Sequence, residues 1–303
     1  MSTIKKAIIL MILLAVFIPI IHSSKLIAWI SPRDNNPANV FQTIGVNEAN
    51  ILASLGEKKE IVDTPTPVLQ EPQTNKSFVA PQKPYRILIM GDSLIAVAGG
   101  VGEIMEQKLI AIGGSEVLRE GKVSSGLMRP DYFDWQKESS ILANSFNPNI
   151  AIVMMGTNDA QSIDIKEDGK KKILSYGSHE WDNEYTNRVK KFNNQLTNKG
   201  VTVYWIGLPA MRDAPYAARI RHLNELNEAA DKENSQVKYI SAEDLMAGDK
   251  TAYLAFMPDE NGVMKATRIS DGIHLSYFGS NYLVGKVIDT LKKDIDLSGI
   301  APN

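Results

Sequence analysis

From about residue 85 to residue 297, short apolar segments alternate with longer amphipathic segments. The apolar segments predict buried strands, and the amphipathic segments between them predict helices. Such an alternation is typical of a parallel sheet covered by helices on both faces. We therefore expect an α/β fold, a three-layer αβα sandwich around a mostly parallel five-stranded sheet. The strands are expected at 86–90, 116–118, 150–155, 201–206 and 237–240, and the main helices at 131–145, 180–198, 217–234 and 276–293.

The first 30 residues differ from the rest of the chain. Lys5 and Lys6 precede an apolar run over residues 7–21, and residues 26–30 extend the apolar character. This run is long for the core of a signal peptide and short for a membrane span, which takes about 20 helical residues. Because no Ala-x-Ala cleavage motif follows, an anchor in the inner membrane is favoured over a cleaved signal. In either case the lysines predict that the remainder is exported.

Residues 31–84 form a second segment of distinct composition. Prolines recur there among Asn, Gln, Thr and Lys, which is typical of an extended linker. The sequence thus predicts a membrane or signal segment at 1–30, a linker at 31–84 and a folded domain at 85–303. Residues 164–178 of this domain are a lysine-rich polar insertion, which we expect to form a flap at the edge of the sheet.

Charge and residue usage exclude several classes of function. The formal net charge is -2 with lysines and acidic residues interspersed, so the chain lacks the basic footprint of a nucleic-acid-binding protein. It contains no cysteine, which excludes disulfides, thiolate metal sites and a cysteine nucleophile. Its four histidines lack the spacing of a metal site, and we expect neither a metal nor a cofactor.

Two of the predicted strands end abruptly in small polar residues. Gly91-Asp92-Ser93 follows the first strand, and Gly156-Thr157-Asn158-Asp159 follows the third. The carboxyl ends of parallel strands meet at one edge of the sheet, where the ligands of open α/β folds bind. Ser93 would also open a helix, whose free N–H groups can hold an oxyanion. A helix-capping role alone is the other interpretation of this serine.

A third polar segment, Ser270-Asp271-Gly272-Ile273-His274, precedes the last predicted helix. An aspartate and a histidine three residues apart in a turn can place the carboxylate against one imidazole nitrogen. The other nitrogen then remains free to take a proton from a serine. The oxyanion formed by such an attack needs donors from backbone N–H groups and an amide side chain. Asn158 and the loop around Gly126 lie where such donors are expected.

With these residues the sequence resembles the SGNH hydrolase superfamily, also called the GDSL esterase and lipase superfamily. Its four marker blocks are matched in order by Gly91-Asp92-Ser93-Leu94, Gly126, Gly156-Thr157-Asn158-Asp159 and Asp271-Gly272-Ile273-His274-Leu275. More narrowly, the chain resembles a bacterial, exported subfamily catalogued as a domain of unknown function. That likeness lies in Met155 to Gln161, Trp181 and Tyr185, Gly207 to Arg212, and Ile269 to His274. The resemblance covers about residue 84 to the C-terminus and implies a flavodoxin-like strand order.

The resemblance also implies a role for each marker residue. Ser93 would be the nucleophile, His274 the base and Asp271 the residue that orients it. The oxyanion would be held by the amides of Ser93 and Gly126 and by the side chain of Asn158. The second marker block has fewer glycines and asparagines here than is usual in the superfamily, so a neighbour of Gly126 is the alternative donor.

Three further residues are candidates for binding substrate. Asp92 adjoins the nucleophile, Arg212 follows the fourth strand and can grip a carboxylate or sugar hydroxyls, and Trp181 can stack on a sugar. Two of them have a structural alternative. Arg212 could instead form an ion pair with Asp213 or Asp159, and Trp181 could lie in the core.

These predictions combine into an exported serine esterase, periplasmic and held at the inner membrane, that removes acetyl or other small acyl groups from a glycan of the cell envelope. An O-acetyltransferase with the same triad, served by an unidentified membrane partner, is the closest alternative. Nothing in the sequence distinguishes water from a sugar hydroxyl as the acceptor. A non-catalytic glycan-binding or envelope-assembly protein is the third interpretation, and the intact marker residues argue against it.

Overall fold

Five parallel strands form the central sheet, in the order β2-β1-β3-β6-β7. The structure is a computed structural model that describes residues 77–112, 115–247 and 252–297. This strand order is that of flavodoxin-like folds, as the resemblance implied. The strands are β1 (Tyr85–Gly91), β2 (Ser115–Gly121), β3 (Ile150–Met154), β6 (Thr202–Ile206) and β7 (Val237–Ile240).

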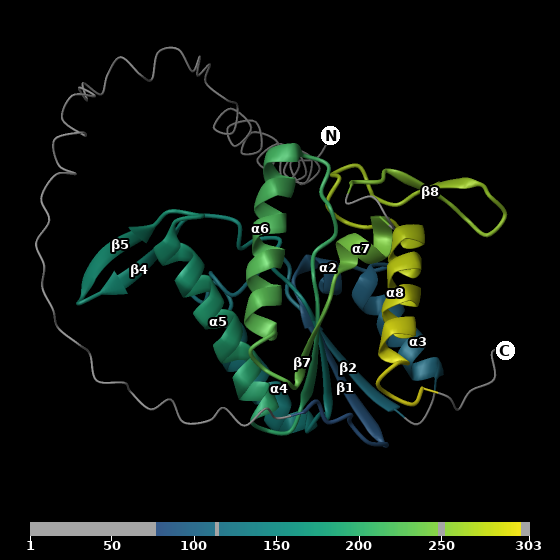
Figure 1. Ribbon diagram of the computed structural model, residues 1–303, viewed down its shortest axis with the longest axis horizontal. Helices are drawn as coiled ribbons and strands as arrows, with labels where there is room; N and C mark the ends of the chain where they lie inside the picture. The colour runs from purple at the N-terminus through teal and green to yellow at the C-terminus, as the bar shows by residue number, and fades with distance from the viewer. Residues whose placement is uncertain (1–76, 113–114, 248–251, 298–303) are drawn as a thin grey trace, which may run out of the picture. The chain divides into compact units, whose positions relative to one another are not determined.

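Helices cover both faces of the sheet, which confirms the predicted three-layer α/β arrangement (Figure 1). One face carries α4 (Trp135–Phe146), α5 (His179–Thr197) and α6 (Ala214–Asp231), and the other carries α3 (Val101–Ala111), α7 (Ala242–Ala247) and α8 (Tyr277–Leu291). The short helix α2 (Ser93–Ala96) follows β1 directly. Because both faces are covered, the inner strands β1, β3 and β6 consist mostly of apolar residues, and every residue of β3 and β6 is buried.

The structure differs from the prediction in several elements. β2 is longer than expected, because this edge strand pairs with β1 along its whole length. α4 begins at Trp135 rather than 131, because the Asp134 side chain accepts a hydrogen bond from the Lys137 N–H and caps the helix there. The stretch before α8, in which no helix or strand was expected between residues 240 and 276, contains α7 and a hairpin of β8 (Phe256–Pro258) and β9 (Met264–Ala266).

The polar insertion near residue 164 folds into a second hairpin. β4 (Ile163–Glu167) and β5 (Lys170–Leu174) pair in antiparallel fashion around a turn at Asp168 and Gly169, which both have positive φ angles. Figure 1 shows this hairpin projecting outward beside α5, away from α2. The predicted flap is therefore not folded over the edge of the sheet near Ser93.

The chain divides into two units, Met1–Glu71 and Pro72–Asn303, and every described residue belongs to the second. The predicted membrane segment at 1–30 and most of the linker lie outside the described residues. Residues 77–84, predicted as linker, are part of the domain, because Val79 exchanges two hydrogen bonds with the Gln236 side chain, at 2.7 and 3.1 Å. Among the described residues, no helix is long and apolar enough to cross a membrane.

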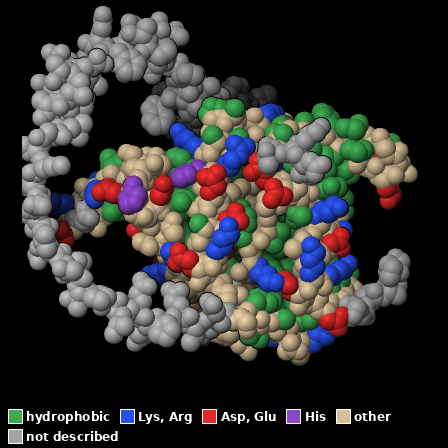
Figure 2. Space-filling model, viewed as in Figure 1, with side chains coloured by type: hydrophobic (Ala, Val, Ile, Leu, Met, Phe, Trp, Pro, Cys, Tyr) green, Lys and Arg blue, Asp and Glu red, His purple; other side chains and the backbone are tan. Residues whose placement is uncertain are grey.

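Charges of both signs are distributed over the surface of the domain. Figure 2 shows lysine, arginine and acidic side chains intermingled on the face that carries α6 and α8. This face therefore has no extended basic patch of the kind that binds nucleic acid.

Candidate active site at the carboxyl edge of the sheet

The structure brings together three residues that are far apart in the sequence. Ser93 is the first residue of α2, while Asp271 and His274 lie in the turn that precedes α8. The Ser93 Oγ lies 2.8 Å from His274 Nε2, and His274 Nδ1 lies 2.6 Å from Asp271 Oδ2. A hydroxyl, an imidazole and a carboxylate linked in this order can activate the hydroxyl as a nucleophile.

Asp271 is held in place by the backbone of its own turn. Its Oδ1 accepts hydrogen bonds from the N–H groups of Ile273 and His274, at 2.8 and 3.0 Å. Partial burial raises the pKa of Asp271, but the hydrogen bonds from the His274 side chain and from these two N–H groups outweigh it, so the pKa lies below its usual value. The carboxylate therefore stays ionised at neutral pH and can orient the imidazole.

Asp92 is a structural residue of the nucleophile turn. It is 0% exposed, and its Oδ1 accepts from the Leu94 N–H at the start of α2. Its Oδ2 accepts from the N–H groups of Gly156 and Thr157 and from the Thr157 hydroxyl, at 3.0, 3.0 and 2.6 Å. Burial raises the pKa of Asp92, and these bonds oppose the rise. The prediction that Asp92 binds substrate is wrong, because its carboxylate is enclosed between two turns.

Gly91 allows these two turns to lie close together. A Cβ atom at this position would lie 2.0 Å from the carbonyl oxygen of Met154 on the neighbouring strand β3. Any side chain here would push β1 and β3 apart at the edge where Ser93 emerges.

The predicted oxyanion donors lie on three neighbouring segments. Among the described residues, the backbone N–H groups of Ser93 and Gly126 have no hydrogen-bond acceptor. The Asn158 side-chain amide donates to the Ser125 carbonyl at 2.9 Å and to the Thr157 hydroxyl at 3.2 Å. The Ser125 carbonyl belongs to the peptide whose N–H is that of Gly126. Asn158 therefore holds this peptide in a fixed orientation, whether or not it also donates to an oxyanion.

Asp159 is a residue of the site whose role the sequence analysis missed. It is 0% exposed, and its carboxylate accepts from the N–H groups of Leu127 and Met128, at 3.0 and 2.9 Å. A Cβ atom on Gly126 would lie 2.2 Å from Asp159 Oδ1, so only glycine permits this contact. Burial raises the pKa of Asp159 to about 6, although the two N–H groups lower it. The signal for this role is the acid that ends the Gly-Thr-Asn-Asp block.

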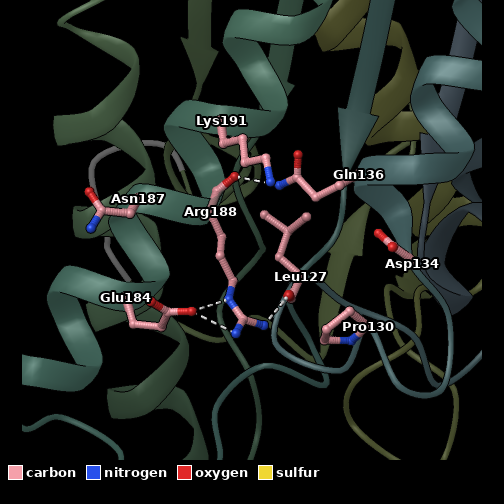
Figure 3. A pocket seen from close by; sticks show the side chains of 8 residues that line it. All are labelled: Leu127, Pro130, Asp134, Gln136, Glu184, Asn187, Arg188 and Lys191. Atoms are coloured by element: carbon pink, nitrogen blue, oxygen red, sulfur yellow. Dashed lines mark hydrogen bonds and ion pairs between the residues drawn. The ribbon is translucent and has the colours of Figure 1, made fainter. Parts of the chain in front are cut away.

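Arg188 supports the same loop from the side of α5. Its Nη1 donates to the Leu127 carbonyl at 2.9 Å, and its Nε donates to Glu184 at 2.7 Å, as Figure 3 shows. These contacts form one wall of a hollow of about 360 Å³ between α4 and α5. The loop from Ser125 to Met128 is thus held by Asn158 and Asp159 at the edge of the sheet and by Arg188 from the side of α5.

A small hollow adjoins the triad. It measures about 10 Å³ and is lined by Ser93, His274, Ser280, Gly100 and four apolar residues, Leu94, Val97, Val101 and Leu275. This is about the room that a single water-sized group requires. The lining is largely apolar, which suits a methyl group better than a polar one.

Trp181 does not lie at the site. It is 0% exposed in the core, its indole N–H donates to the Gln161 carbonyl at 2.9 Å, and its ring stacks on Tyr185. The prediction that it binds substrate is wrong, and its structural alternative is confirmed.

Arg212 is exposed beside the triad turn, and neither predicted ion pair is formed. Asp213 accepts from the Tyr216 N–H to cap α6, and Asp159 is occupied by the Leu127 and Met128 N–H groups. Within the described ranges, no group of histidine and acidic side chains could hold a metal ion.

Comparisons with known proteins place these observations in context. The family described as "Protein of unknown function (DUF459)" matches residues 86–290, and no curated protein matches the chain. Among solved structures, the chain is similar to a Clostridium thermocellum family 3 carbohydrate esterase, with 16% identity over 69% of this chain and 98% of that chain and a TM-score of 0.45. It is similar to a carbohydrate acetylesterase family member from Sinorhizobium meliloti, with 12% identity, coverage of 69% and 98%, and a TM-score of 0.47. A GDSL-like lipase from Bacteroides thetaiotaomicron gives 13% identity, coverage of 70% and 90%, and a TM-score of 0.44.

Proposed function

This chain belongs to the DUF459 family of proteins of unknown function, and on that premise we propose that it acts as a serine esterase of the SGNH type. The observation that carries the proposal is the continuous hydrogen-bonded chain from the Ser93 hydroxyl through His274 to Asp271. A serine that only caps a helix does not require a histidine nitrogen 2.8 Å from its hydroxyl. A histidine that is only a surface residue does not require a carboxylate oxygen 2.6 Å from its ring.

The reaction follows from this arrangement. His274 Nε2 takes the hydroxyl proton while Ser93 Oγ attacks the acyl carbonyl, and Asp271 stabilises the resulting imidazolium. The oxyanion that forms accepts hydrogen bonds from the free N–H groups of Ser93 and Gly126. The C–O bond to the alcohol then breaks, His274 returns the proton to the leaving oxygen, and acyl-Ser93 remains. Water attacks this ester by the same steps in reverse and releases the acid.

We propose that the acyl group is acetyl and that the alcohol is a glycan of the cell envelope. The hollow of about 10 Å³ beside Ser93 supports the first part, because its largely apolar lining leaves room for a group about as large as a methyl. The apolar segment and the proline-rich linker support the second, because an exported domain on a tether can reach envelope polymers.

The acceptor distinguishes an esterase from an O-acetyltransferase. The Asp271 side chain is 37% exposed and the His274 side chain 26%, so the base is open to water. An acetyltransferase must keep water from acyl-Ser93. The exposure of the triad therefore favours hydrolysis, and transfer to an added sugar remains the second candidate.

Hydrolysis of p-nitrophenyl acetate by the full chain tests the proposal. We expect Ser93→Ala and His274→Ala each to lower kcat by several orders of magnitude without loss of the fold, because nucleophile and base act as a unit. Asp271→Ala should lower kcat less, because other groups can partly replace its role in orienting His274. A Ser93→Ala protein that keeps a tenth of the wild-type rate would contradict the triad. An acetylated sugar formed when a glycan acceptor is added would identify a transferase.

We propose further that the chain is periplasmic, with an uncleaved anchor ending near residue 30. Lys5 and Lys6 before the apolar run, and the missing cleavage motif, support this topology. Mass spectrometry of the membrane fraction tests it, and a mature N-terminus between residues 23 and 31 would show cleavage instead.

A further inference from the structure

The Arg212 side chain is packed against the turn that carries the base. Arg212 lies at the end of the segment between β6 and α6, and its N–H donates to the Gly272 carbonyl at 3.2 Å. A Cβ atom on Gly272 would lie 2.6 Å from Arg212 Cβ, 2.7 Å from Nε and 3.0 Å from Cζ. The stem and the guanidinium therefore occupy the space that the missing side chain of Gly272 leaves between Asp271 and His274.

The Arg212 guanidinium forms no pair with an acid among the described residues. Among the described residues, the Arg212 side chain makes no hydrogen bond and no ion pair, and the residue is exposed. The nearest acids in the sequence and in the turn are otherwise engaged, since Asp213 caps α6 and Asp271 binds His274. A cation is thus held beside the turn that carries Asp271 and His274, with its donors free.

A second arginine, Arg219, lies in α6, seven residues after Arg212. Arg219 donates to the Ala160 carbonyl at 3.3 Å and lies over the Tyr176 ring, 5.4 Å from its centre. Between the two, the Tyr216 hydroxyl donates to the Thr157 carbonyl at 2.5 Å. The first half of α6 therefore follows the edge of the sheet, with Arg212 at the turn that holds Asp271 and Arg219 at the turn after β3.

Guanidinium groups bind oxyanions with two parallel hydrogen bonds and are suited to carboxylate and phosphate. We propose that Arg212 binds an anionic group of the substrate, so that the ester is carried by an acidic saccharide. The inference rests on the proposed esterase function and narrows its substrate class. Arg219 adds a second positive charge along the same edge of the sheet.

The test compares acetyl esters that differ only in charge. The substrates are an acetylated methyl glucoside, the matching glucuronoside and the matching glucoside phosphate, all hydrolysed by the full chain. Wild type should hydrolyse at least one anionic ester with a higher kcat/KM than the neutral ester. Arg212→Gln should reduce this preference about tenfold or more by raising KM, because one charge-assisted contact is lost. Arg212→Lys should restore part of it. The uronate and phosphate arms show which anion is recognised.

A matched control and a binding measurement separate the possible outcomes. Lys232→Gln removes the same charge from the far end of α6, where the side chain is 73% exposed, and should leave the preference intact. Calorimetry measures the binding of the unacetylated glucuronoside and glucoside phosphate to the Ser93→Ala chain. Adding Arg212→Gln should weaken the binding of the preferred anion at least tenfold. If no ester is cleaved, the esterase proposal fails while this binding still tests Arg212. Equal losses on neutral and anionic esters, the same shift with Lys232→Gln, or unaltered anion binding would overturn the inference.

Discussion

At the scale of single residues, Asn158 connects the nucleophile turn to the loop that contains Gly126. Its amide donates to the Ser125 carbonyl, which lies in the same planar peptide as the Gly126 N–H. Two roles are therefore open to this side chain. It can orient the donor peptide, or it can exchange its longer bond to Thr157 for a bond to the oxyanion.

We predict that Asn158→Asp lowers kcat more than Asn158→Ala. A carboxylate in this position loses the donor and faces the Ser125 carbonyl and the developing oxyanion with a negative charge. Alanine leaves room for a water to replace the amide in part. The loss of one oxyanion donor costs about 10²–10³ in kcat, or roughly 3–4 kcal/mol.

Steady-state kinetics and melting curves of the two variants separate the roles of Asn158. A donor to the oxyanion acts only in the transition state, so its loss lowers kcat while KM and the melting temperature stay nearly constant. A residue that only orients the loop changes kcat, KM and melting temperature together. Near-normal kcat in Asn158→Asp would remove Asn158 from the mechanism.

The sequence predicted residues whose roles depend on local patterns and missed those that depend on packing. Asp271 and His274 lie three residues apart in one turn, so their pairing is largely local. Asp92 was misassigned because its burial depends on Gly156 and Thr157, which follow another strand. Asp159 was missed because its partners lie more than thirty residues earlier in the chain.

At the scale of elements, the loop between β2 and α4 depends on the absence of a side chain at Gly126. The Asp159 carboxylate lies where a Cβ atom would be and binds the next two N–H groups of this loop. The position of the Gly126 N–H is therefore determined by a contact that only glycine allows.

We predict that Gly126→Ala lowers kcat toward p-nitrophenyl acetate by about 10² or more. The added methyl displaces either Asp159 or the loop, and both changes move the predicted oxyanion donor. Gly285→Ala is the matched control. Nothing lies within 4 Å of a Cβ at Gly285 in α8, so this change should preserve the rate and stabilise the helix by roughly 0.5–1 kcal/mol. A Gly126→Ala enzyme with the wild-type rate would show that this loop supplies no donor.

Element prediction succeeded where the hydrophobic pattern is strong and failed where it is short. β1, β3 and β6 were found because their apolar runs are buried by helices on both faces. The two hairpins were not, because β8 and β9 have three residues each and most of the side chains in both hairpins are exposed. Such strands carry almost no burial signal in the sequence.

At the scale of the whole molecule, Asp231 makes the stability of the domain depend on pH. It lies at the end of α6, 2% exposed, where Asn193 donates to its Oδ1 at 2.7 Å and its Oδ2 has no partner. Burial raises the pKa of Asp231 to about 8 from 3.8. The folded state keeps the proton over a range in which the unfolded state has lost it. The free energy of unfolding therefore falls as pH rises from about 4 to about 8.

We predict that Asp231→Asn flattens this pH dependence. Asparagine imitates the neutral acid and still accepts a hydrogen bond from Asn193. The free energy of unfolding of the variant should therefore exceed that of wild type by a few kcal/mol at pH 9 and equal it near pH 5. Urea unfolding at both pH values measures the difference. Asp289→Asn, at a side chain 67% exposed, is the control. If the free energies of unfolding of wild type and Asp231→Asn changed equally with pH, Asp231 would be ionised in the folded state.

The all-parallel sheet also affects how the domain assembles. No two neighbouring strands of this sheet are joined by a tight hairpin, so every pairing closes a long segment of chain, which slows folding. Ser93 and His274 are 181 positions apart, and the whole of α8, 15 residues, is synthesised after the histidine. A partly synthesised chain thus holds a nucleophile without its base. Because His274 lies directly before α8, the onset of ester cleavage in a refolding experiment should coincide with the docking of α8 on the sheet.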